Sequence, residues 1–177
     1  MSLQFFPGTK NSMEYKEQLV EEILLEQYDQ YYRLAYSYVH NEADAADIVQ
    51  NGAYKAIRKC ATIQKTEYAK TWVYRIMLNE IFRALKEPKL ISFEAALEDG
   101  QMTNEIEQAS AVEDTYEDVD LQRALHTLEP KDKAVVELRY FEDLKIEEIA
   151  EILQENVSTV KSRLYRSMKK LRVKLEE

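Results

Sequence analysis

The chain has 177 residues, of which 45% are hydrophobic, and this is enough for one domain of ordinary size or two small ones. It carries 24 basic and 33 acidic side chains, which gives a net charge of -9. This charge argues against a polyanion-binding site that extends over the whole surface. Only three glycines occur, which excludes the glycine-rich loops that bind dinucleotides or nucleotide phosphates. Any nucleic-acid site must therefore be a local basic patch.

Cysteine and histidine content restricts the chemistry further. Cys60 is the single cysteine, and two histidines cannot complete a Cys/His zinc site with it. No apolar run approaches the roughly 20 residues that cross a bilayer, and residues 1–12 lack the basic start and long apolar stretch of a secretory signal. We therefore expect a cytoplasmic protein with no metal, cofactor or membrane insertion. Residues 1–12 are treated as a leader that is disordered or left over from cloning.

Charge divides the chain into three parts. Residues 1–86 hold 11 basic and 11 acidic side chains, residues 87–120 hold 1 and 11, and residues 121–177 hold 12 and 11. The middle part therefore holds the excess negative charge, and its weak periodicity is typical of a linker. The predicted organisation is a first domain at 13–87, an acidic linker at 88–118 and a second domain at 119–177.

Helical periodicity dominates both flanking parts, and this predicts an all-α protein. In the first domain we predict one helix over 19–39, and Asn41 can cap a second helix over 42–59. A third helix over 68–85 must stop before Pro88. The predicted buried stripe of the first helix consists of Leu24, Tyr28, Tyr31, Ala35 and Tyr38.

In the second domain the pattern predicts helices over 121–128, 131–140, 146–153 and 157–175. Pro130 fits the first turn of the second of these helices. Only three residues separate the last two helices. The predicted core-facing stripe of the last helix consists of Val160, Leu164, Met168, Leu171 and Leu175.

Residues 146–175 have the form of a helix-turn-helix, in which the second helix enters the DNA major groove. Between Asn156 and Leu175 there are seven basic side chains and no carboxylate. Such a density in an acidic protein indicates a polyanionic partner more strongly than a solvated helix face. The residues that we expect to contact duplex DNA are Ser158, Thr159, Lys161, Ser162, Arg163, Arg166 and Lys169.

Two stretches also resemble a known family, the extracytoplasmic-function (ECF) type of bacterial sigma factor within the sigma-70 family. Region 4 of that family is similar to ALHTLEPKDKAVVELRYFEDLKIEEIAEILQENVSTVKSRLYRSMKKLR. Region 2 is similar to YYRLAYSYVHNEADAADIVQNGAYKAI followed by TWVYRIMLNEIFRALK. The resemblance covers nearly everything from 19 to 175 except the linker. It implies a transcription initiation factor whose partners are core RNA polymerase, promoter DNA and an anti-sigma factor, with no small-molecule substrate.

The resemblance also implies roles for individual residues. Region 2 of the family binds the clamp helices of polymerase and captures the melted −10 element, while region 4 reads the duplex −35 element. The implied polymerase-binding residues lie around the motif DIVQ and are Asp44, Asp47, Ile48 and Gln50. For the melted strand, the loop 61–67 and its flanking helices offer the aromatic and basic side chains that single-strand binding needs. The implied −10 residues are Arg58, Lys59, Tyr68, Lys70, Trp72, Arg75 and Asn79.

Other interpretations remain open from the residues alone. Trp72 also fits a hydrophobic core, and the tyrosines from 28 to 38 are expected to pack there. Asp44 and Asp47 share a helix face and could form a metal site with His40, although caps and surface charges explain them more simply. The chain could instead be a dimeric helix-turn-helix regulator, or a scaffold that binds polymerase without reading DNA. An enzyme is not supported, because no nucleophile, base and orienting group can be assembled.

Several positions depart from the family's pattern. Gln154 in the recognition turn and Asp143 stand where glycine is usual, and Glu155 stands at a usually apolar site. If the turn requires a left-handed backbone, Gln154 costs up to about 1 kcal/mol, whereas Asp tolerates that conformation. Gly52 replaces a usual threonine beside the polymerase-binding motif. Arg83 replaces a usual aspartate in the −10 domain.

Overall fold

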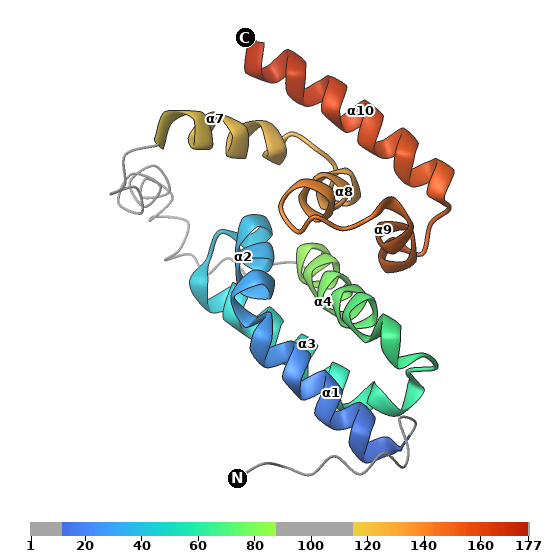
Figure 1. Ribbon diagram of the computed structural model, residues 1–177. Helices are drawn as coiled ribbons and strands as arrows, with labels where there is room; N and C mark the ends of the chain where they lie inside the picture. The colour runs from blue at the N-terminus through green and yellow to red at the C-terminus, as the bar shows by residue number, and fades with distance from the viewer. Residues whose placement is uncertain (1–11, 88–114, 177) are drawn as a thin grey trace.

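The computed structural model describes residues 12–87 and 115–176, and every regular element in these two ranges is helical (Figure 1). The predicted all-α class is confirmed. Residues 1–11 and most of the predicted linker lie outside the described residues. The elements are α1 (Met13–Glu26), α2 (Tyr28–Val39), α3 (Glu42–Lys59), the 3-10 turns η1 (Cys60–Thr62) and η2 (Thr66–Tyr68), α4 (Ala69–Lys86), α7 (Thr115–His126), α8 (Pro130–Tyr140), α9 (Ile146–Leu153) and α10 (Val157–Glu176).

The prediction of one continuous helix over 19–39 is wrong, because the chain breaks at Gln27 into α1 and α2. The side chain of Gln27 accepts a hydrogen bond from the Tyr31 hydroxyl at 2.9 Å, so the break is tied to the first turn of α2. The phase of the helix changes there, and Tyr28 is 46% exposed instead of buried. The buried residues of the two helices include Val20, Ile23, Tyr31, Leu34, Ala35 and Tyr38.

Helix ends follow local chemistry that the sequence already indicates. Asn41 caps α3, since its side-chain oxygen accepts from the backbone N–H of Asp44 at 2.9 Å. His40, Asp143 and Gln154 have positive φ angles of 50°, 52° and 54°. The two positions where the family usually has glycine are therefore left-handed here, and Gln154 bears the cost expected for a side chain in that conformation.

Helices α3 and α4 are in close contact at Gly52. A Cβ atom at this position would lie 2.4 Å from the Met77 sulfur and 3.2 Å from its methyl carbon. Met77 is buried within the core, so its side chain has little room to move away. The absence of a side chain at Gly52 therefore permits the contact, and a larger residue there would require the Met77 side chain or α4 to shift.

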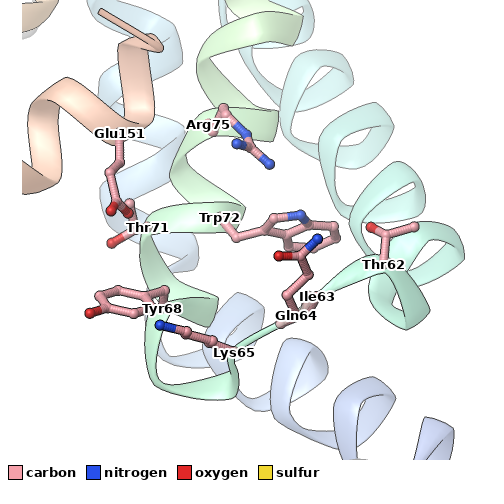
Figure 2. A pocket seen from close by; sticks show the side chains of 9 residues that line it. All are labelled: Thr62, Ile63, Gln64, Lys65, Tyr68, Thr71, Trp72, Arg75 and Glu151. Atoms are coloured by element: carbon pink, nitrogen blue, oxygen red, sulfur yellow. The ribbon is translucent and has the colours of Figure 1, made fainter. Parts of the chain in front are cut away.

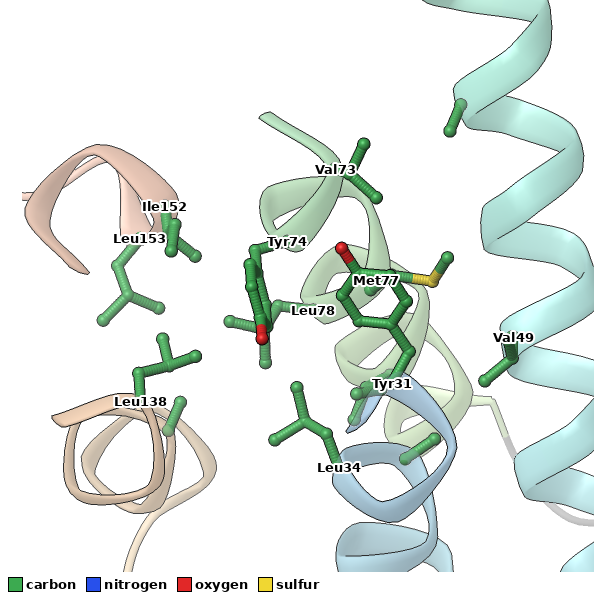
Figure 3. Packing of buried hydrophobic residues seen from close by; sticks show 14 of the residues in the cluster. Tyr31, Leu34, Val49, Val73, Tyr74, Met77, Leu78, Leu138, Ile152 and Leu153 are labelled. Atoms are coloured by element: carbon green, nitrogen blue, oxygen red, sulfur yellow. The ribbon is translucent and has the colours of Figure 1, made fainter. Parts of the chain in front are cut away.

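One hydrophobic core extends across both domains, with α4 at its centre (Figure 3). Tyr74 and Leu78 of α4 lie on the side of α8 and α9, where the core continues into Leu138, Ile152 and Leu153. The opposite side of α4 packs on α2 and α3. The two domains are thus packed on each other. A smaller second core joins α7, α8 and α10 and consists of Ala124, Leu125, Leu128, Val136 and Leu171.

The buried face of α10 differs from the predicted stripe at two positions. Val160 and Leu171 are buried as predicted, but Met168 is 39% exposed and Leu175 is 50% exposed. Ser167 occupies the inward position instead, and its buried hydroxyl has no hydrogen-bond partner. Small Ser167 permits close packing where the neighbouring methionine would be too long. Within the described ranges, no helix is both long and apolar enough to cross a membrane.

We expect Gly52→Ala to destabilise the protein by roughly 1 kcal/mol, within a range of about 0–2.5 kcal/mol. Overpacking against Met77 costs about 1–3 kcal/mol, and alanine recovers about 0.5–1 kcal/mol through helix propensity. Urea unfolding measures the change, and Asn51→Ala on the same helix is the control. In a Met77→Ala background the same Gly52→Ala change should cost less. Equal costs in both backgrounds would show that the two residues do not collide.

Candidate nucleic-acid interface

An open pocket of about 560 Å³ lies between the loop after α3 and the first turns of α4 (Figure 2). The structure brings the predicted loop together with three of the predicted −10 residues, Tyr68, Trp72 and Arg75. Trp72 and Arg75 share one face of α4, and Tyr68, the N-cap of this helix, lies about one turn before Trp72. The lining residues are Thr62, Ile63, Gln64, Lys65, Tyr68, Thr71, Trp72, Arg75 and Glu151.

The pocket combines aromatic surface with positive charge. Tyr68 is 47% exposed, and the ammonium group of Lys65 lies 5.8 Å from the centre of its ring. Trp72 is half-buried: it packs against the hydrophobic core and also lines the pocket. The core position expected for Trp72 is therefore seen in part, and its contact with the melted strand stays a prediction. Aromatic faces beside cations are the side chains on which unpaired bases stack.

The remaining predicted −10 residues lie outside this pocket. Asn79 is exposed one turn beyond Arg75 on α4, and Lys70 lines a separate, smaller pocket beside α1. Arg58 and Lys59 are exposed at the end of α3. Arg58 donates a hydrogen bond to the Tyr54 hydroxyl at 2.9 Å, so it is partly engaged within its own helix.

The outward face of α10 is polar and basic along its length. Among the predicted duplex contacts, Ser158, Lys161, Ser162, Arg166 and Lys169 are exposed, and Thr159 is half-buried. Tyr165 is 73% exposed among these side chains. The sequence analysis did not name Tyr165, although its position off the apolar stripe was a usable signal.

Arg163 differs from its neighbours because its guanidinium group is paired within the protein. It donates to Asp132 of α8 at 2.7 Å, and it makes two hydrogen bonds to the carboxylate of Glu155 at 2.8 and 3.0 Å. The hydrogen bonds from Arg163 hold the pKa of Glu155 below its ordinary value of 4.5. Such bidentate pairs are strong and directional. Arg163 therefore connects α10 to the recognition turn and to α8.

The predicted polymerase-binding residues separate into two groups. Asp44, Asp47 and Gln50 are exposed on α3. Ile48 is 5% exposed and belongs to the core, so in this structure its side chain cannot contact another protein. Among residues 12–87 and 115–176, no three His, Cys, Asp or Glu side chains form a group that could hold a metal ion, and His40 with its neighbouring aspartates is no exception.

Two family profiles match the chain over most of the described residues. They are "Sigma-70 region 2" over residues 24–89 and "Sigma-70, region 4" over residues 118–171. The RNA polymerase sigma factor SigV of Bacillus subtilis (strain 168) is 42% identical over 145 residues, which cover 82% of this chain and 84% of SigV. The chain belongs to the sigma-70 family. The ECF RNA polymerase sigma factor SigW of the same strain is 29% identical over 84% of each chain.

Two solved structures share the fold, and the first of them is of a sigma factor. RpoE of Bartonella quintana, crystallised with the anti-sigma factor NepR, has a TM-score of 0.65 and 20% identity over 88% of this chain and 96% of that chain. CnrH, solved with the cytosolic domain of CnrY, has a TM-score of 0.64 and 18% identity over 94% of this chain and 97% of that chain. The matches cover both domains. The protein is an ECF-type transcription initiation factor, and the regulator and scaffold alternatives are not favoured.

We expect Arg163→Ala to destabilise the sigma factor by about 1.5–3 kcal/mol, because it removes charge-assisted hydrogen bonds and leaves buried Asp132 unpaired. The sequence analysis placed Arg163 among the duplex contacts, and loss of an exposed contact of that kind would not change stability by this amount. Arg166→Ala, on the exposed face three residues later, is the control and should be nearly neutral. Urea unfolding of both variants measures the difference. Equal stability of the two variants would show that the hydrogen bonds of Arg163 to Glu155 and Asp132 do not stabilise the fold.

Proposed function

We propose that region 2 of this sigma factor captures the unpaired −10 strand in the pocket beside α4. The observation that carries this proposal is the convergence of Tyr68, Trp72 and Arg75 with Lys65 around one open pocket. Base stacking on an aromatic side chain contributes about 1–3 kcal/mol per base, and nearby cations attract the strand's phosphates. Asn79 lies beyond Arg75, where its amide can hydrogen-bond to a base edge.

Region 4 reads the duplex −35 element through the exposed face of α10. Lys161, Arg166 and Lys169 supply cations there, and Ser158 and Ser162 supply hydroxyl groups near the start of the helix. Arg163 is a positioning residue in this proposal, since its pairing with Glu155 and Asp132 fixes α10 against the turn and α8. Its expected direct contact with DNA is therefore replaced by an indirect role.

Polymerase binding is proposed for the exposed acidic edge of α3, formed by Asp44, Asp47 and Gln50. Ile48 supports this edge from the core. One structural neighbour was solved with an anti-sigma factor and the other with the cytosolic domain of CnrY. We propose that this chain also binds a protein of the anti-sigma class. The proposed factor acts in the cytoplasm, catalyses no reaction and takes no small-molecule substrate or cofactor.

Asp47→Arg should weaken binding to core RNA polymerase without loss of stability. Asp47 is exposed on α3, so reversal of its charge changes the surface and leaves the core intact. Competition with a labelled sigma factor for core polymerase measures the affinity. Asp29→Arg, an equal charge reversal at an exposed site of α2, should have little effect. Unchanged affinity of the Asp47 variant would remove this edge from the polymerase interface.

Promoter melting tests the proposal as a whole. Arg75→Ala combined with Asn79→Ala should leave binding to polymerase and to the −35 duplex nearly intact, yet abolish initiation on a fully paired promoter. A promoter that is mismatched across the −10 element should recover part of the activity, because premelting supplies the unpairing energy but not the lost contacts. Permanganate footprinting of unpaired thymines measures the open bubble.

Two exposed residues elsewhere in region 2, changed together as Gln18→Ala with Arg33→Ala, serve as the control and should melt promoters normally. A normal bubble in the Arg75/Asn79 variant would overturn the assignment of the pocket. Promoters for both assays are obtained by selection from a random DNA library with the reconstituted holoenzyme.

A further inference from the structure

Most of helix α1 precedes the region 2 profile, which begins at residue 24. The helix packs on the turn η1 and on α3 and α4. Its buried positions are Lys16, Val20 and Ile23, which are spaced by four and three residues and so lie on one face of the helix. The first position of this otherwise apolar face therefore holds a charged residue.

Lys16 connects α1 to the end of α3. Its side chain is 9% exposed, and its ammonium group donates a hydrogen bond to the carbonyl oxygen of Ala61 at 3.4 Å. Ala61 lies in η1, which directly continues α3, and carbonyl oxygens at the end of a helix carry partial negative charge and lack helical partners. The contact thus fixes, relative to α1, the point at which the chain leaves α3.

Stability alone does not account for a lysine at this position. A methionine has a similar length and would fill the same space without taking a charge out of water. A lysine with a buried stem keeps its ammonium group at a polar partner, and here that partner is the Ala61 carbonyl oxygen. The charge at this core position is therefore explained by what it holds.

The segment that Lys16 holds leads directly into one wall of the strand pocket. Residues 62–65 line the pocket, and Lys65 extends toward the ring of Tyr68 (Figure 2). Ile63 is 3% exposed and packs in the core, so the middle of the wall is anchored by burial. The start of the wall is anchored at Ala61.

Local hydrogen bonds shape this segment but do not tie it to another helix. The Thr62 hydroxyl donates to the Lys59 carbonyl oxygen at 2.7 Å, and the Ile63 N–H donates to the Cys60 carbonyl oxygen at 3.1 Å. Both bonds span three positions. The bond from Lys16 spans 45 positions, so it constrains where the wall stands in the domain.

We propose that Lys16 is a positioning residue for the −10 strand, and that its hydrogen bond to Ala61 fixes the loop wall of the pocket before the strand arrives. The inference rests on the proposed role of the pocket in strand binding. A strand that enters a preordered pocket does not have to order the wall, so more of the stacking and charge attraction is left as affinity. Lys16 is buried behind the wall, so its effect on the strand is exerted through the loop.

Amide hydrogen exchange measures the order of the loop in the free, full-length protein. Lys16→Met removes the ammonium group and keeps an unbranched side chain of similar length. Exchange at residues 61–65 should become at least about three-fold faster, because local opening of the loop costs less, while exchange in the middle of α4 stays constant.

Ile81→Val is the matched control, since Ile81 is fully buried toward the other end of α4. It lowers global stability and should leave exchange at residues 61–65 unchanged. Unchanged exchange in Lys16→Met, or an equal increase in both variants, would overturn the positioning role. Lys16→Gln replaces Lys16→Met if circular dichroism shows that the latter is unfolded. Loss of folding in both Lys16 variants would make Lys16 a structural residue and overturn the proposal.

Strand binding tests the consequence for function. Holoenzyme is reconstituted with each variant, and its affinity for a labelled single-stranded oligonucleotide with a selected −10 sequence is followed by fluorescence anisotropy. Lys16→Met should weaken binding by about three- to ten-fold, whereas Ile81→Val should not. The slope of affinity against salt should stay the same in Lys16→Met, because a buried lysine neutralises no phosphate. A smaller slope would indicate direct phosphate contact and overturn the positioning role.

Arg75→Ala and Tyr68→Ala separate this inference from the proposed function of the pocket. If neither change weakens strand binding, the pocket assignment fails, while hydrogen exchange still decides whether Lys16 orders the loop. If both changes weaken strand binding and Lys16→Met does not, the pocket stands and the positioning role of Lys16 is overturned.

Discussion

Helix α4 has to pack against two sets of neighbours at once, and the rest of the structure depends on how it does so. Met77 faces α3, where its sulfur lies within 2.4 Å of the place that a Cβ atom would take at Gly52. Tyr74 and Leu78 face region 4. Trp72 and Arg75 lie at the pocket. Because one rigid helix carries all three faces, the placement of the pocket is coupled to the core of region 2 and to the interface with region 4.

Sequence analysis succeeded where structure is determined by residues near one another in the chain. The bounds of α9 agree with the prediction, and the cap at Asn41 forms as expected. The break at Gln27 has no glycine or proline to mark it and is stabilised by a side-chain contact with Tyr31. Its effect on helix phase could not be predicted from periodicity alone, and Tyr28 was misplaced as a result. Similarly, Ser167 and Met168 are adjacent in the sequence. A small error in the predicted helical phase therefore assigns the buried position to Met168 instead of Ser167.

The candidate site shows the same division between local and distant determinants. The aromatic and basic residue types at the start of α4 indicated the pocket, because their spacing places them on one helix face. Arg163 was misjudged because its partner Asp132 lies 31 positions away and is reached only when α8 and α10 pack together. Glu151 could not be found at all from sequence, since only the docking of region 4 on region 2 brings it to the pocket.

The two proposed DNA-binding surfaces, the outward face of α10 and the pocket beside α4, require different forms of DNA. The chain is acidic overall, so the proposed attraction to duplex DNA depends on the local basic face of α10, where Lys161, Arg166 and Lys169 are exposed. That face needs only duplex DNA, which is always present. The proposed pocket of region 2 requires an unpaired strand. Binding of such a strand contributes to initiation only when polymerase is at a promoter.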